Sequence, residues 1–213
     1  QIQPASLDLT LSNECYEIKA SFLSPNNTVR DKLKTHSVKK INLKTPKIFK
    51  KNKTYIVKLN ERLNLNYSIK GYCNPKSSSG RLNIFCRTIL DYCDEYEKIP
   101  KNYNGEMFIE ITTRSFDIIF NEGDKLNQMR LVRDNNNYLD DKKLLQLQKR
   151  VPLVFGRNKN IFDNGLKLSV DLSNNNKICA YVSKFTKNKI NFKHINFYNK
   201  NNFWIPLKSK NKS

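Results

Sequence analysis

Apolar and polar residues alternate along much of the first 131 positions, which is the pattern of half-buried β-strands. Ala5, Leu7, Leu9 and Leu11 fall on one side of an extended chain, and residues 16–22 repeat the pattern. Further alternating segments occupy residues 54–59, 67–73, 84–90, 107–112, 116–120 and 126–131. Turn-forming residues separate these segments at 24–27, 74–75, 104–105 and 122–124. Many short strands at this spacing predict a mainly β fold, as a sandwich or a distorted barrel.

One helix is predicted after this β region. Asp140 is a good N-cap, because its side chain can accept a hydrogen bond from a backbone N–H that lacks a helical partner. Leu144 and Leu147 follow on one side of the helix, and Pro152 ends the pattern. We therefore interpret residues 133–160 as a connector that contains a helix.

A short echo of the opening strand follows the connector. Residues 6–9 read Ser-Leu-Asp-Leu and residues 169–172 read Ser-Val-Asp-Leu, and a second alternating segment follows at 178–185. This predicts a β-domain over residues 1–132 and the start of a second, truncated copy of it over 161–213. Chance recurrence of a common strand pattern is the alternative explanation.

Composition narrows the functional classes. The 213 residues carry 39 Lys and Arg against 19 Asp and Glu, a formal charge of +20 that suggests nucleic-acid binding. However, 30 of the 39 are Lys, and +14 of the charge falls after residue 141, so we interpret most of it as Lys- and Asn-rich genome bias. Nucleic acid is therefore an unfavoured partner.

Location and completeness can also be predicted from the sequence. No apolar run approaches the ~18 residues of a membrane-spanning helix, so no membrane association is expected. Five widely spaced cysteines without a CxxC pair fit reduced thiols in a cytoplasmic protein. Because the chain starts at Gln1 without an initiator methionine, we expect it to be a fragment, truncated at both ends if the repeat is real.

Residues 74–82, Asn-Pro-Lys-Ser-Ser-Ser-Gly-Arg-Leu, carry the first candidate chemistry. Three hydroxyls, free backbone N–H groups and the cations Lys76 and Arg81 lie within six residues, a set that suits polyphosphate oxygens. The segment is not a P-loop, because no Gly-Lys-Ser/Thr closes it. A solvated polar turn is the simpler interpretation of the same composition.

Glu110 is the second candidate, because it interrupts the apolar strand 107–112. Alternation places Phe108, Glu110 and Thr112 on one face of that strand. If that face is buried, loss of solvation would raise the pKa of Glu110 into a range useful for proton transfer. An exposed glutamate on the wet face of a sheet is the alternative.

Residues 91–97 hold six acidic or phenolic side chains, which could bind sugar hydroxyls or a metal, or form a solvated acidic loop. The only histidines are His36 and His194, and the His-x-Glu and Pro-Cys-x-x-Cys motifs of zinc deaminases are absent from this sequence. Any hydrolysis would therefore have to activate water without zinc.

In this order, these stretches resemble the dCTP deaminase/dUTPase family, which has a β-clip fold. The opening residues 2–9 are similar to its first strand motif, and Lys76–Leu82 to its phosphate loop. Tyr103-Asn-Gly105 followed by Phe108-Ile-Glu110 resembles its aromatic-x-Gly and glutamate strand, and residues 123–128 resemble its late motif. The likeness covers residues 2–131 and is strongest to a longer, tandem form of dCTP deaminase found in proteobacteria.

The resemblance implies a hydrolase that deaminates dCTP to dUTP without zinc, feeding dUMP and dTMP synthesis. Glu110 would be the general base and then the acid, while Ser77 and Arg81 would position water and phosphate. The remaining implied substrate-binding residues are Lys76, Ser78, Asp91, Asp94 and Ile109, with either Asp91 or Asp94 at the sugar hydroxyl. Mg²⁺ would accompany the triphosphate, no metal would be bound by the protein alone, and sites would form between the subunits of a homotrimer.

Two competing functions stay open at this point. One is dUTP diphosphatase, alone or combined with deamination, since Asp91 resembles the aspartate that orients attacking water in dUTPases. The other is a non-catalytic β-domain that binds nucleic acid through its basic tail, which would show as steeply salt-dependent binding.

Overall fold

The computed structural model describes residues 2–133, 139–154, 161–168 and 178–208. The chain divides into two compact units, Gln1–Asp134 with Ser183–Ile205, and Asn135–Val182 with Pro206–Ser213. Within the described residues, no helix has the length and apolar character needed to cross a membrane. Each unit is described by itself below.

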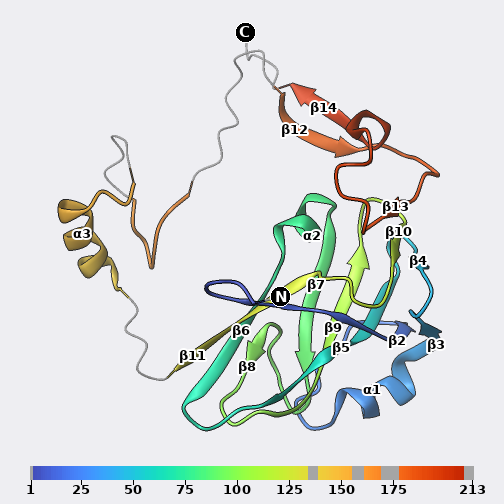
Figure 1. Cartoon of the computed structure of the whole chain (residues 1–213), viewed down its shortest axis with the longest axis horizontal. Helices are drawn as coiled ribbons and strands as arrows, with labels where there is room; N and C mark the ends of the chain where they lie inside the picture. The colour runs from blue at the N-terminus through green and yellow to red at the C-terminus, as the bar shows by residue number, and fades with distance from the viewer. Residues whose placement is uncertain (1, 134–138, 155–160, 169–177, 209–213) are drawn as a thin grey trace. The chain divides into compact units, whose positions relative to one another are not determined.

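The first unit is a sandwich of two antiparallel sheets (Figure 1). The larger sheet has the strand order β3 (Ser37–Asn42), β2 (Leu11–Ile18), β5 (Thr54–Asn64), β9 (Asn104–Thr113) and β7 (Ile84–Leu90). The smaller sheet has the order β1 (Leu7–Leu9), β11 (Asn127–Arg133), β6 (Ile69–Pro75) and β8 (Lys98–Ile99). The prediction of a mainly β, dUTPase-like fold is confirmed.

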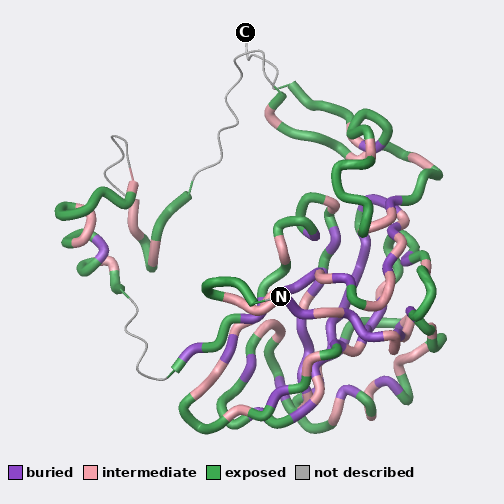
Figure 2. The backbone as a smooth tube through the Cα atoms, viewed as in Figure 1, coloured by how far each residue is buried: buried purple, intermediate pink, exposed green. Residues whose placement is uncertain are grey.

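The main hydrophobic core fills the space between these sheets (Figure 2). Leu9, Cys73 and Met129 reach it from the smaller sheet, and Val57 and Ile109 reach it from the larger one. Alternation explains this arrangement, because every second residue of each strand points to the same face. The large apolar side chains are buried here, and this burial provides most of the driving force for folding.

A second, smaller core covers the opposite face of the larger sheet. Helix α1 (Val29–His36) begins at Thr28, whose hydroxyl accepts a hydrogen bond from the N–H of Asp31. The helix buries Val29 and Leu33 against apolar side chains of the sheet that include Ile56 and Phe108. The residues of this face that lie under α1 and the segment before it, such as Ile56 and Phe108, are therefore shielded from water.

A third sheet brings a distant part of the chain into the same unit. Its order is β13 (Ile190–Asn191), β10 (Ile118–Phe120) and β4 (Lys47–Phe49), and β13 runs parallel to β10. Ile190 and Phe203 join the main core. Strands β12 (Ile178–Ser183) and β14 (Trp204–Lys208) pair with each other, and most residues of both belong to the second unit. The short 3-10 helix η1 (Lys200–Asn202) precedes β14 in the chain.

The second unit contains the helix expected in the connector, α3 (Asp141–Arg150). Asp140 is its N-cap and accepts a hydrogen bond from the N–H of Lys143, so this prediction is confirmed. The echo at 169–172 lies outside the described residues. The predicted domain limits of 1–132, 133–160 and 161–213 stay predictions.

Three local predictions were wrong or incomplete. The strand expected at 16–22 ends at Ile18, and α1, β3 and β4 were not anticipated. The candidate phosphate loop after Pro75, for which no helix was predicted, forms a single helical turn, α2 (Ser77–Arg81), with Lys76 as its N-cap residue. Small hydroxyl side chains tolerate this tight turn, and the turn determines which of the three serines face solvent.

Candidate functional site

The candidate phosphate loop is anchored to the strand that carries the late motif. The backbone N–H of Lys76 and the hydroxyl of Ser79 both donate to the carbonyl oxygen of Leu126, each at 2.8 Å. Ser79 is fully buried, whereas Ser77, Ser78 and Arg81 are exposed. One serine therefore holds the turn in place, and two hydroxyls and a guanidinium are left facing solvent.

A polar hollow of about 600 Å³ adjoins the start of this turn. Asp8 lies at its base, and its Oδ2 is 2.6 Å from Nζ of Lys76. The carboxylate of Asp8 is buried, and its Oδ1 has no hydrogen-bond partner among the described residues. The hollow is lined by Gln3, Pro4, Ala5, Ser6, Asp8, Pro75, Lys76, Ser77 and Gln128.

Glu110 lies in the middle of the larger sheet. In the register of β9 it is paired with Ile56 on β5 and with Arg87 on β7, and only 2% of its surface is exposed. The alternative of a solvent-exposed glutamate is therefore wrong. Nε and Nη2 of Arg87 each lie 2.9 Å from Oε1 of Glu110. The other oxygen, Oε2, is buried and has no hydrogen-bond partner in the part of the chain that the structure describes.

Arg87 was not among the predicted site residues. Its guanidinium lies 3.7 Å from the ring centre of Tyr96 and 5.3 Å from that of Phe85. No local signal in the sequence indicates this role, because Arg87 and Glu110 are more than twenty positions apart and meet only through the register of two strands.

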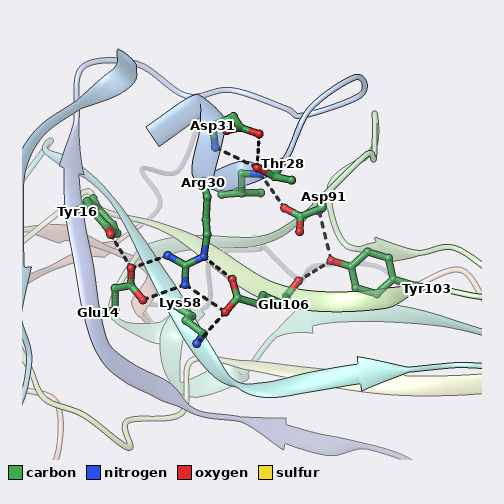
Figure 3. A network of polar contacts seen from close by, with 10 residues as sticks. Glu14, Tyr16, Thr28, Arg30, Asp31, Lys58, Asp91, Tyr103 and Glu106 are labelled. Carbon is green, nitrogen blue, oxygen red and sulfur yellow. Dashed lines mark hydrogen bonds and ion pairs between the residues drawn. The ribbon is translucent and has the colours of Figure 1, made fainter. Parts of the chain in front are cut away.

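A second ion-pair network, which the sequence did not reveal, connects α1 to the larger sheet (Figure 3). Arg30 on α1 donates to Glu14 of β2 and to Glu106 of β9, and Lys58 of β5 lies 2.9 Å from Glu106. The hydrogen bond from Arg30 lowers the pKa of Glu106 to about 2. Burial raises the pKa of Glu14, but hydrogen bonds from Arg30 and Tyr16 outweigh it, so the pKa ends below its ordinary value. The network fixes α1 across three strands.

Asp91 also contacts α1. Its Oδ1 accepts a hydrogen bond of 2.7 Å from the N–H of Val29, at the first turn of the helix (Figure 3). Burial raises the pKa of Asp91. Asp94, the other candidate for the sugar hydroxyl, is exposed. The assignment of either aspartate to the sugar stays a prediction.

The aromatic-x-Gly motif has a steric explanation. The hydroxyl of Tyr103 donates to the carbonyl oxygen of Glu106 and accepts from the N–H of Asp91, so the ring folds over Gly105 (Figure 3). A Cβ at Gly105 would lie 2.7 Å from that hydroxyl and 2.9 Å from the ring carbon that carries it. Only glycine leaves room for the ring in this position.

The predicted site residues fall into two groups. Lys76 and Ser77 line the hollow, and Ser78 and Arg81 belong to the same turn. Glu110 does not line the hollow and points to the face of the larger sheet that α1 covers. The side chain of Ile109 is fully buried in the main core. Among the described residues, the structure thus gives two separate parts of a site, a polyphosphate-compatible turn and a buried carboxylate.

Comparison with known proteins adds two findings. Residues 1–135 match the family model of the 2'-deoxycytidine 5'-triphosphate deaminase N-terminal domain, and residues 140–213 match that of its C-terminal domain. The crystal structure of 2'-deoxycytidine 5'-triphosphate deaminase from Agrobacterium tumefaciens is similar, with 34% identity and a TM-score of 0.89 over 99% of this chain. The present chain spans 63% of that protein. No curated protein matched in a separate comparison.

Proposed function

Since the chain belongs to the 2'-deoxycytidine 5'-triphosphate deaminase family, we propose that the protein hydrolyses dCTP to dUTP and ammonia without zinc. The observation that carries the proposal is Glu110, a buried carboxylate with one oxygen held by Arg87 and the other without a partner among the described residues. The similar Agrobacterium protein is a dCTP deaminase by its title.

The proposed chemistry needs a single carboxylate. Glu110 takes a proton from water as the water oxygen bonds to C4 of cytosine, the electrons of the C4–N3 double bond move to N3, and Glu110 passes the proton to N3. Glu110 then takes the proton of the new C4 hydroxyl and gives it to N4, so that the C4–O double bond forms as the C4–N4 bond breaks and ammonia leaves. One group can act as base and then as acid, because both steps occur at the same carbon.

The turn after Pro75 is proposed to bind the triphosphate. Lys76 and Arg81 supply positive charge, and the hydroxyls of Ser77 and Ser78 supply donors that face solvent. Ser77 and Arg81 are also proposed to position the attacking water. Asp91 or Asp94 is proposed to bind the sugar hydroxyl, and the backbone of Ile109 is proposed to lie near the base.

Mg²⁺ is proposed to enter with the triphosphate. Across the residues that the structure describes, no group of three or more His, Cys, Asp or Glu side chains is arranged to hold a metal. The donors nearest the turn are hard oxygens, including the unpartnered Oδ1 of Asp8, which suit Mg²⁺ shared with phosphate oxygens. The ion would neutralise phosphate charge.

A homotrimer is proposed for the complete enzyme, with each site built from two copies. The support is the separation of the two parts, since Glu110 is not among the residues that line the hollow beside the phosphate turn. A second copy could bring its own turn to the first copy's carboxylate. The four buried, unpaired cysteines fit the proposed cytoplasmic location, where thiols stay reduced.

The competing functions receive less support. The dUTP diphosphatase reading assigns Asp91 to the attacking water, but one oxygen of Asp91 already accepts from the N–H of Val29. The nucleic-acid reading rests on the +20 charge alone.

Product analysis tests the proposed function. The full-length protein is incubated with dCTP and Mg²⁺, ammonia is measured enzymatically, and nucleotides are separated by anion-exchange chromatography. We expect equal amounts of ammonia and dUTP. Pyrophosphate with a monophosphate as the first products would support the diphosphatase instead, and no turnover of dCTP would contradict the proposal.

A further inference from the structure

Arg87 makes an unusually one-sided contact with Glu110. Its Nε and its Nη2 both lie 2.9 Å from the same oxygen, Oε1, while Oε2 has no hydrogen-bond partner among the described residues. An arginine paired with a carboxylate often contacts both of its oxygens, one with each nitrogen. Here the two oxygens of one carboxylate are made chemically different.

This asymmetry determines which oxygen can exchange a proton. The N–H of Nε donates to Oε1 and Nη2 lies in ion-pair contact with the same oxygen, so a proton could bind there only after this charge-assisted hydrogen bond breaks. No hydrogen-bond donor among the described residues occupies Oε2, so a proton can bind there without breaking a hydrogen bond. Glu110 is 2% exposed, so bulk water does not supply alternative partners.

Aromatic rings hold the guanidinium in this orientation. Its centre lies 3.7 Å from the ring centre of Tyr96, close enough for stacking, and 5.3 Å from that of Phe85. Tyr96 is itself fixed, because its hydroxyl donates to the carbonyl oxygen of Phe22 at 3.3 Å. The planar guanidinium suits this stack. A lysine ammonium could neither stack on the ring nor approach Oε1 with two nitrogens at once.

We propose that Arg87 is a positioning residue, which orients Glu110 so that Oε2 is the oxygen that exchanges the proton with water. Tyr96 supports it from the loop 91–97. The inference rests on the proposed deamination and adds to it a residue outside the motifs that resemble the family's. It also gives the loop 91–97 a structural role in the reaction through Tyr96.

The charged and titratable groups around Glu110 are few. Arg87 faces it from β7, and its neighbour on β5 is the apolar Ile56. Burial raises the pKa of Tyr96, and the nearby charge of Glu110 raises it further. Helix α1 contributes the apolar Val29 and Leu33 to this face. Among the described residues, Arg87 is thus the cation in direct contact with Glu110.

The test compares Arg87→Met, Arg87→Lys, Tyr96→Leu and the control Tyr96→Phe in the full-length protein. Ammonia release from dCTP is measured as kcat and KM between pH 5 and 9. We expect kcat of Arg87→Met to fall on the order of 100-fold, the effect of a misplaced reacting group, with KM changed less than threefold.

The other variants make the outcome decisive. Arg87→Lys should recover only part of kcat, since it restores the positive charge without the planar guanidinium. Tyr96→Leu should lower kcat several-fold and Tyr96→Phe by less, because the ring supports the guanidinium directly and the hydroxyl only holds the ring in place. If Arg87→Met does not fold, Arg87→Lys and Tyr96→Leu carry the test.

Two failures can be told apart. If wild-type protein releases no ammonia from dCTP, the proposed function fails. If wild-type protein is active and the folded Arg87 and Tyr96 variants all stay within twofold of it in kcat, the deaminase assignment stands and the role of Arg87 is overturned.

Discussion

Replacing Gly105 with alanine should destabilise the fold by forcing Tyr103 out of its place. The added Cβ would lie 2.7 Å from the Tyr103 hydroxyl and 2.9 Å from the adjacent ring carbon, whereas ordinary contacts begin near 3.4 Å. Tyr103 is 7% exposed, so it cannot swing into solvent without vacating a buried site. Gly105 has no positive φ, so the cost comes from crowding and not from backbone conformation.

The magnitude follows from three contributions. Overpacking at a buried site costs about 1–3 kcal/mol. Weakening the Tyr103 hydrogen bonds to Glu106 and Asp91 costs about 0.5–1.5 kcal/mol each, and only part of each is lost. Alanine also lowers the conformational entropy of the unfolded chain, which offsets about 0.4–1 kcal/mol of the lost stability. The free energy of unfolding should therefore fall by about 2 kcal/mol.

Urea unfolding followed by circular dichroism measures this change. With an m value of about 2 kcal/mol/M, the midpoint should fall by roughly 1 M. Gly80→Ala is the matched control, because a Cβ there would meet nothing within 4 Å and the residue lies in the helical turn α2. That variant should be as stable as wild type, or up to about 1 kcal/mol more stable.

A double variant isolates the contact itself. In a Tyr103→Phe background the nearest atom to the new Cβ is gone, so Gly105→Ala should cost at least about 0.5 kcal/mol less than it does in wild type. The steric explanation is refuted if Gly105→Ala unfolds at the wild-type midpoint, or if both glycine variants shift the midpoint equally.

Three further outcomes concern the buried and half-buried polar networks. Arg30→Met should lower the free energy of unfolding by about 1 kcal/mol in low-salt urea titrations, a small cost because Arg30 is 43% exposed; no change would show that the pairs contribute nothing. Glu106 has its pKa lowered to about 2 by Arg30, so its charge stabilises the fold above about pH 4.5, and this stabilisation is lost as pH falls towards 2. The stability difference between wild type and Glu106→Gln should shrink over that interval, and a constant difference would contradict the assignment. Asn127→Ala should cost about 3 kcal/mol by thermal unfolding, because it removes the buried amide that donates to Glu97; a loss no larger than that of exposed Asn74→Ala would count against this.

The β-sandwich could be predicted from the sequence because its main core lies between two sheets. Each strand buries one face there, and this gives the alternation of residues such as Leu7, Leu9 and Leu11 a direct structural meaning. Helix α1 could not be predicted in the same way. It buries only Val29 and Leu33, and two apolar positions do not define a helical period.

The candidate site, too, could be predicted from the sequence only in part. Glu110 and the turn at Ser77–Arg81 carry local signals, a carboxylate in an apolar strand and a run of hydroxyls between two cations. The contacts that complete them are not local. Arg87 meets Glu110 only through strand register, and Asp8 meets Lys76 across nearly seventy residues. Pairings of this kind require the folded chain.

The most direct test of the central claim is ammonia release by the Glu110→Gln variant. Glutamine keeps an oxygen that can accept from Arg87, so the fold and the binding of dCTP should survive, while the proton-accepting oxygen is replaced by an amide nitrogen. We expect dCTP affinity within a few-fold of wild type by isothermal titration calorimetry, and ammonia release reduced by at least about 10²–10⁴-fold. A Glu110→Gln protein that still releases ammonia at close to the wild-type rate would contradict the account.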